Sequence, residues 1–192
     1  MTEPKRTVNY NYLPKQFPAV TSATWKGDSI THRILARIAD VARRGDFTLG
    51  SEVELFEQAW SDVIEAQYAI GMSNGTDAIA IALQAAGMEP GDEVITSPFS
   101  FIATSGAILQ AGGRPVFIDT ASHLDPNIHP MNMDMPDAAW AVPVMWAGSP
   151  SGMVNWSLVK GTKVVVDAAQ GMNALAGGDP LGAGDFYGVM VE

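Results

Sequence analysis

The sequence of 192 residues contains no cysteine. Without thiols the chain can form no disulfide, no thiolate nucleophile and no cysteine-based zinc site. Positive charge is also scarce, because 11 lysines and arginines stand against 21 acidic residues and give a formal net charge of −10. Such a surface repels phosphate backbones and anionic lipid, so we expect neither nucleic acid nor a membrane as a partner. A bound phosphate would need a local site made from backbone N–H groups.

Long apolar runs are missing as well. The most apolar stretch, residues 138–148, is too short to span a bilayer and contains Pro143. The N-terminus has no apolar segment of the length that a signal peptide requires, so we expect a cytoplasmic protein. The three histidines, His32, His123 and His129, lack metal-ligand spacing, and no metal site is expected.

The chain divides into a polar arm and a more apolar body. Residues 1–27 are polar and dotted with prolines, which predicts an extended N-terminal arm. Residues 28–192 are expected to form a domain, since hydrophobic residues make up 47% of the sequence and suffice for a core. Within this body, residues 120–137 are irregular and are expected to form a connection over the surface.

Two spacing patterns predict the secondary structure. Apolar residues at helical spacing, with capping and stop signals, predict helices over residues 28–44, from 51 onward, and over 74–86 and 101–111. The second of these helices opens with the form of a capping box at residues 51–54. Short apolar runs predict strands over residues 68–72, 93–97, 115–119, 140–144 and 163–167. The alternation indicates an α/β fold with a mostly parallel sheet covered by helices on both faces.

The segment Ser73-Asn74-Gly75-Thr76-Asp77-Ala78 lies at the start of a predicted helix. Gly75 allows a ligand to approach the backbone, and the free N–H groups of the first turn form an anion site with the Thr76 hydroxyl as a further donor. The alternative is an ordinary helix cap in which Asp77 interacts favourably with the helix N-terminus. Taken alone, the segment favours the cap.

A second candidate, Asp167-Ala168-Ala169-Gln170, follows a predicted buried strand. Ligands of open α/β sheets bind outside the carboxyl ends of the strands, where Asp167 is expected. An ionised carboxylate there could pair with a protonated ring nitrogen of a cofactor, or could cap the next turn instead. A third candidate is the segment 97–101, where an aromatic ring could stack on a planar cofactor or could belong to the core.

The order of these motifs resembles that of the DegT/DnrJ/EryC1/StrS aminotransferases, the sugar aminotransferases of pyridoxal phosphate (PLP) fold type I. The resemblance covers roughly residues 8–192, and so many ordered matches are hard to attribute to chance. The matching segments are residues 45–50, 53–57, 73–78, 91–95, 101–104, 113–119 and 164–170.

The resemblance implies a fold and a set of site residues. The fold would be an incomplete large domain of a PLP-dependent transferase, over residues 28–192, with the C-terminal small domain absent. Gly75 and Thr76 would bind the cofactor phosphate. Phe101 would stack on the pyridine ring, Asp167 would pair with the ring nitrogen, and Gln170 would lie beside the oxygen side of the cofactor.

The family transfers an amino group, usually from glutamate, to a nucleotide-linked keto-sugar, and it works as a homodimer. Its Schiff-base lysine stands about two dozen residues after the aspartate, beyond Glu192, so no catalytic residue is assigned in this sequence. The family histidine after Pro143-Val144 is Met145 here. We therefore expect activity to need a complementing C-terminal polypeptide or a homo-oligomer.

Two alternatives remain beside a partnered aminotransferase. The chain could bind PLP non-covalently, or a nucleotide-sugar, without catalysing amino transfer. It could also be a scaffold or interaction protein that retains the fold.

Overall fold

The computed structural model describes residues 30–130, 137–150, 161–171, 174–176, 179–180 and 188–190. The chain divides into two compact units, with the boundary between Leu55 and Phe56. The arm predicted for residues 1–27 lies outside the described residues. Among the residues that are described, no helix is long and apolar enough to cross a membrane.

The first unit contains the predicted helix α2, Ile30–Arg44, and the start of α3, Ser51–Ile64. Gly45, with φ of 70°, ends α2 in the left-handed conformation that glycine adopts at little cost. The predicted apolar stripe of α2 is largely exposed, with Ile30 and Ile38 61% and 59% accessible to solvent.

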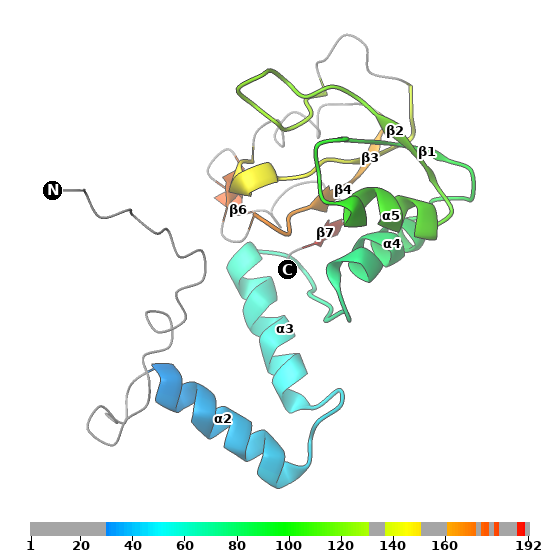
Figure 1. Ribbon diagram of the computed structural model, residues 1–192. Helices are drawn as coiled ribbons and strands as arrows, with labels where there is room; N and C mark the ends of the chain where they lie inside the picture. The colour runs from blue at the N-terminus through cyan, green and yellow to red at the C-terminus, as the bar shows by residue number, and fades with distance from the viewer. Residues whose placement is uncertain are drawn as a thin grey trace, which may run out of the picture. The chain divides into compact units, whose positions relative to one another are not determined.

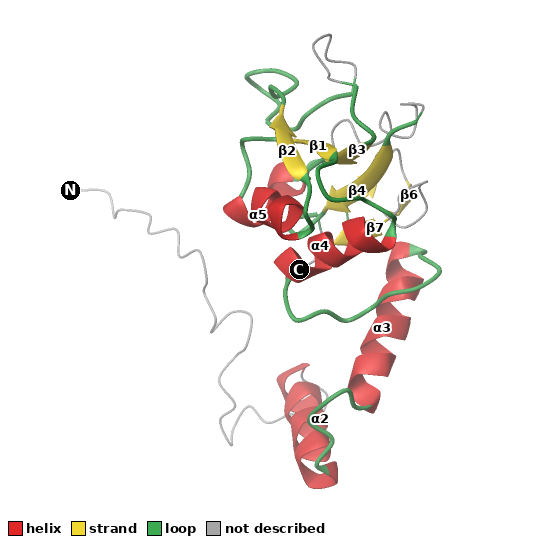
Figure 2. Cartoon of the chain, turned by 90° about the vertical axis from the view of Figure 1, so that its right-hand side faces the viewer, coloured by secondary structure: helices red, strands yellow, loops and turns green. Residues whose placement is uncertain are grey.

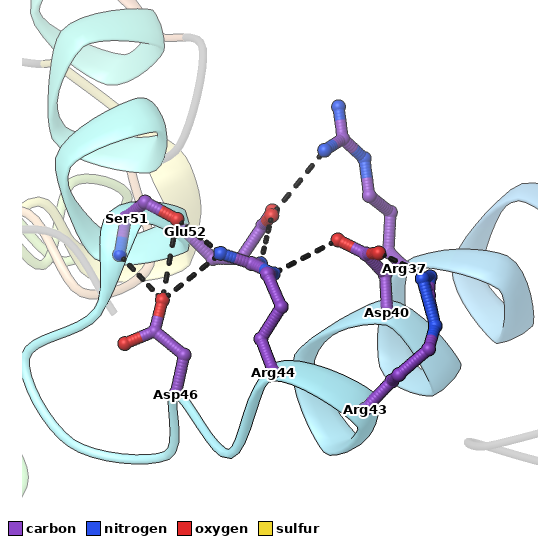
Figure 3. A network of polar contacts seen from close by, with 7 residues as sticks. All are labelled: Arg37, Asp40, Arg43, Arg44, Asp46, Ser51 and Glu52. Carbon is purple, nitrogen blue, oxygen red and sulfur yellow. Dashed lines mark hydrogen bonds and ion pairs between the residues drawn. The ribbon is translucent and has the colours of Figure 1, made fainter.

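Arg44 joins the two helices of the first unit through its guanidinium group (Figure 3). It lies 3.0 Å from Asp46 Oδ2 and 3.1 Å from Glu52 Oε1, and its Nε lies 3.0 Å from Asp40 Oδ2. The same Asp46 oxygen accepts a hydrogen bond from Ser51 N at 3.1 Å. Asp46 therefore supplies an acceptor at the start of α3, where the sequence had suggested a capping box within residues 51–54.

The second unit is built on a parallel sheet (Figure 1). Its strands lie in the order β2-β1-β3-β4-β7, and every pairing between neighbours is parallel. The bounds are Glu93–Thr96 for β1, Arg114–Phe117 for β2, Trp140–Val142 for β3, Lys163–Asp167 for β4 and Gly188–Met190 for β7. The α/β class and the parallel sheet predicted from the sequence are confirmed.

Helices α4, Gly75–Ala85, and α5, Ile102–Gln110, cover one face of this sheet (Figure 2). Their buried residues, among them Ile79, Leu83 and Ile108, pack with Trp140 and Val165 from the strands. On the opposite face, buried residues from the strands and from described loops form a second core cluster. The residues of this second cluster are Ile95, Ile118, Ile128, Ala138, Ala141, Met145, Val164, Val166 and Ala168.

Two expectations are wrong. The connection over 120–137 does not run wholly over the surface, because Asn127 and Ile128 are each 1% exposed and Ile128 joins the core. Residues 68–72 do not form a strand, and Tyr68 and Ile70 are 74% and 77% exposed. An isolated extended segment has no hydrogen-bonding neighbour to stabilise it, and the described strands offer none beside residues 68–72.

The remaining elements are short. The 3-10 turn η1, Trp146–Gly148, follows β3, and strands β5, Leu175–Ala176, and β6, Asp179–Pro180, form a two-residue antiparallel pair. Strand β7 was not predicted from the sequence, and it pairs with the carboxyl half of β4 in the register Val166↔Val189.

Candidate active site

The N-terminus of α4 presents an anion-binding arrangement. Asn74 is the N-cap, and its side chain accepts a hydrogen bond from Asp77 N at 2.9 Å. The backbone oxygen of Asn74 accepts from Ala78 N at 3.1 Å. The first N–H groups of a helix have no acceptor within the helix. Those of Gly75 and Thr76 therefore point out of the N-terminal end, where an anion could accept their hydrogen bonds.

Asp77 is held by three side chains. Its carboxylate accepts hydrogen bonds from Ser73 Oγ at 2.6 Å, Asn74 Nδ2 at 2.8 Å and Gln110 Nε2 at 3.0 Å. The bond from Ser73, followed by those from Gln110 and Asn74, lowers the pKa of Asp77 below its ordinary value, against a small opposing effect of burial. The helix cap given as the alternative is therefore present, with Asn74 as the cap residue and the Asp77 carboxylate bonded to its side chain.

Asp167 ends β4 and is only 6% exposed. Its backbone is fixed against the segment that follows β3, because its N–H donates to Pro143 O and its backbone oxygen accepts from Met145 N, each at 2.9 Å. Its carboxylate accepts a hydrogen bond from Thr104 Oγ1 at 2.6 Å and one from Ala169 N at 3.3 Å. A buried carboxylate is thus placed at the carboxyl edge of the sheet, as the sequence predicted.

Gln170 positions the turn after β3. Its Oε1 accepts a hydrogen bond from Ala147 N at 2.7 Å. Ala147 has φ of 52°, a left-handed conformation that costs energy in a residue other than glycine. The backbone N–H of the neighbouring Trp146 donates a hydrogen bond to Asn127 Oδ1 at 2.9 Å. The centre of the Trp146 ring lies 5.1 Å from that of the Phe99 ring.

These elements meet at one pocket with a cavity volume of about 90 Å³. The five site residues expected from the sequence all line this pocket, namely Gly75, Thr76, Phe101, Asp167 and Gln170. The pocket lies where β1, β3 and β4 end. In the sheet, β2 lies on one side of β1 and β3 lies on the other, so the strand order reverses between β1 and β3. The pocket is close to this point, which is the common ligand site of open α/β sheets.

Phe101 lines this pocket but is 74% exposed, and it precedes the first residue of α5 without a side-chain cap. Phe99 is 51% exposed, so neither ring belongs to the core. An exposed ring beside a polar pocket is available for stacking on a planar ligand.

Sequence reasoning assigned no role to Ser100, Thr104 or Asn127. Thr104 falls within the predicted helix 101–111, and a single hydroxyl in a helix gives no signal of a bond to a residue 63 positions away. Met145, which stands at the position of the family histidine, is fully buried in the second cluster and is not among the residues lining the pocket.

Lys163 is the only lysine among the described residues. Its Nζ donates to Ala86 O at 3.2 Å and lies 4.7 Å from the centre of the Trp140 ring. It begins β4, whereas Asp167 ends that strand. Its ammonium group is therefore engaged at the opposite end of the strand from the pocket.

The donor set of the pocket fits a cofactor with a phosphate group and a protonated aromatic ring. The N–H groups at the start of α4 suit an anion. The buried carboxylate of Asp167 suits a cation, and Phe101 offers an aromatic surface. Within the described residues no cluster of side chains suits a metal ion.

Two solved structures illustrate what this chain is similar to. The Bacillus subtilis protein NtdA with bound cofactor PMP is 36% identical, with a TM-score of 0.68, over 74% of this chain and 34% of that one. The Streptomyces venezuelae protein DesV, in complex with a ketimine intermediate, is 30% identical, with a TM-score of 0.70, over 83% of this chain and 44% of that one. The fold is accordingly part of that of a PLP-dependent aminotransferase.

The model of the DegT/DnrJ/EryC1/StrS aminotransferase family matches residues 28–190, and the chain belongs to this family. It is 37% identical over 164 residues to a pleiotropic regulatory protein of Geobacillus stearothermophilus. It is 35% identical over 154 residues to a UDP-2-acetamido-2-deoxy-3-oxo-D-glucuronate aminotransferase of Pseudomonas aeruginosa. These matches take in 81% and 76% of this chain but 43% and 42% of the two relatives, so the chain spans about two fifths of their length.

Proposed function

We propose that the pocket binds pyridoxal phosphate or its amino form, and that the chain is the cofactor-binding portion of a sugar aminotransferase. The observation that carries the proposal is that one pocket combines the N-terminus of α4 with the buried carboxylate of Asp167. Family membership supports it, as do relatives named for amino transfer to sugars. When bound, such a cofactor supplies an electron sink for reactions at the carbon that carries the amino group.

Each residue of the pocket would have a separate task. The N–H groups of Gly75 and Thr76, with the Thr76 hydroxyl, would bind the phosphate. Asp167 would hold a proton on the ring nitrogen, because a buried ionised carboxylate favours a cation beside it. Phe101 would cover one face of the ring, and Gln170 would line the side near the 146–148 turn that it holds.

The proposed reaction is amino transfer from glutamate to a nucleotide-linked keto-sugar. One similar protein is named a 3-oxo-glucose-6-phosphate:glutamate aminotransferase, and another a dTDP-3-amino-3,4,6-trideoxy-alpha-D-glucose transaminase. Because Lys163 is engaged at the far end of β4, the proposal does not assign the cofactor-binding role to Lys163 and expects a complementing polypeptide to supply the lysine. That polypeptide would be either a further part of the same protein or a partner chain.

Self-association is part of the same proposal. The apolar residues Ile30, Leu35 and Ile38 of α2 are exposed, and they support a contact between two copies of the chain. A homodimer would be recognised by light scattering coupled to size-exclusion chromatography. A monomeric elution at every concentration would contradict it.

The test of the function is a binding titration with the amino form of the cofactor, followed by tryptophan fluorescence and calorimetry. We expect saturable binding that Thr76→Val and Asp167→Asn each weaken. Thr120→Val serves as a control, because Thr120 lies in the loop after β2 and its hydroxyl bonds only locally, to Ser122 O. Absence of saturable binding by the folded protein would refute cofactor binding.

A further inference from the structure

A pair of hydroxyl groups connects Asp167 with the surface of the pocket. Thr104 is 1% exposed, and its Oγ1 donates to Asp167 Oδ2 at 2.6 Å. Ser100 lines the pocket, and its Oγ lies 2.7 Å from Thr104 Oγ1. Ser100 lies in the loop between β1 and α5, and Thr104 lies in the first turn of α5, so the segment that carries Phe101 also carries the support of Asp167.

The number of protons fixes the direction of these bonds. A hydroxyl group has one proton to donate. Because Thr104 gives its proton to Asp167, Ser100 must be the donor in its contact with Thr104. The resulting chain of donors runs from Ser100 through Thr104 to Asp167, whose carboxyl oxygen accepts the last bond.

We propose that Thr104 and Ser100 are positioning residues that hold Asp167 ionised and fixed in orientation, ready to face a protonated ring nitrogen. Successive hydrogen bonds polarise one another, so the Ser100 hydroxyl strengthens the bond that Thr104 makes. The inference rests on the proposed function, because the ring nitrogen belongs to the proposed ligand.

Two neutral hydrogen-bond donors reach the Asp167 carboxylate in the described part of the chain. Among the pocket-lining residues, all of which belong to the described part of the chain, Asp167 is the only titratable one. Helix α5 contains no charged residue, Asp77 of α4 bonds to Ser73, Asn74 and Gln110, and Lys163 contacts Ala86 and Trp140. The donors that reach the carboxylate from Thr104 and Ala169 are neutral groups.

The first test uses the unliganded protein. The ionisation of the Asp167 carboxyl is followed by carbon NMR in Thr104→Val, Thr104→Ser and the matched control Ser105→Ala, which removes a hydroxyl bonded to Ile102 O on the same helix. A hydrogen bond to the ionised form favours that form. We expect the midpoint of the Asp167 ionisation to move to higher pH in Thr104→Val. In Thr104→Ser and Ser105→Ala it should stay near that of the unmodified protein. An unmoved midpoint in Thr104→Val would overturn the inference.

The second test measures the affinity for the amino form of the cofactor. Thr104→Val should weaken binding roughly tenfold to a hundredfold, the range expected for one hydrogen bond to a charged group, and Thr104→Ser should restore it. In an Asp167→Asn background the same change should have little further effect, because Thr104 acts through Asp167. Equal losses in both backgrounds would assign Thr104 a merely structural role and refute the inference.

The two tests separate the inference from the proposed function. If the unmodified protein binds no cofactor, the function fails, while the NMR midpoint still decides whether Thr104 holds Asp167 ionised. If Thr104→Val does not fold, Ser100→Ala takes its place, because Ser100 is only partly buried and should give a smaller shift in the same direction.

Discussion

Gln110 Nε2 donates a hydrogen bond to Asp77 Oδ1 over 3.0 Å, and so joins the last residue of α5 to the first turn of α4. The two helices pack side by side on one face of the sheet (Figure 2), and residues near the N-terminal end of each line the pocket. The bond therefore ties the proposed phosphate site to the helix that supports Asp167.

The Gln110–Asp77 bond leads to a prediction about acid stability. It is one of the bonds that lower the pKa of Asp77, so the ionised form stabilises the fold above the pKa of the unfolded chain. This contribution disappears as the pH falls through the lower pKa of the folded state. Gln110→Ala should therefore reduce the free energy of unfolding at neutral pH, and the difference from the unmodified protein should shrink below a pH of about 4. Urea unfolding across pH measures the free energies of unfolding of the variant and of the unmodified protein. A difference between them that grows in acid would contradict the prediction.

The cap of α4 gives a second prediction. Asn74→Ala removes the acceptor for Asp77 N and should lower the free energy of unfolding by roughly 0.5–2 kcal/mol. Asn74→Ser keeps an oxygen at the cap and should recover most of the loss, as chemical unfolding would show. If the two variants lose equal stability, the side-chain cap does not stabilise the helix.

The left-handed turn at Ala147 gives a third prediction. With φ of 52°, Ala147→Gly should relieve backbone strain and raise the free energy of unfolding by up to about 1 kcal/mol. The same change within α4, Ala82→Gly, should lower it by about 1 kcal/mol, because glycine disfavours a helix interior. Thermal and chemical unfolding of both variants would check that the free energy of unfolding rises in Ala147→Gly and falls in Ala82→Gly.

Lys163 gives a fourth prediction. Lys163→Met removes the ammonium group that contacts Ala86 O and the Trp140 ring, and should destabilise the fold by on the order of 1 kcal/mol. The affinity for the amino form of the cofactor should be unchanged, because the contacts lie at the start of β4. Borohydride treatment with pyridoxal phosphate should leave the Lys163 peptide unmodified by mass spectrometry. A reduced adduct on Lys163 would show that this chain provides its own lysine.

Much of the architecture could be predicted because it depends on local patterns. Helices α2, α4 and α5 and strands β1 to β4 follow from apolar spacing and from end signals such as Gly45. The pocket residues were expected from the resemblance to the family, and Asp167 was also expected at the pocket because it ends a strand of a parallel sheet. Their meeting in one pocket agrees with the expected site, while their roles remain proposals.

The failures share a physical reason, which is that pairing partners are not visible in a local pattern. Residues 68–72 have the composition of a strand, but a strand forms only beside a neighbour. Ile128 enters the core from a segment with no periodicity, and Thr104 reaches Asp167 only through the folding of α5 onto the sheet. Long-range contacts of this kind could be located only from the structure.

Residues 68–72 also bear on how the protein behaves in concentrated solution. Tyr68 and Ile70 bring apolar surface and strand-forming residues to an exposed segment that has not joined a sheet. Such a segment is a ready template for intermolecular strand addition and for aggregation during storage. Replacing Ile70 with lysine would place a charge in its centre, which makes this position a practical first choice for improving solubility without touching the pocket.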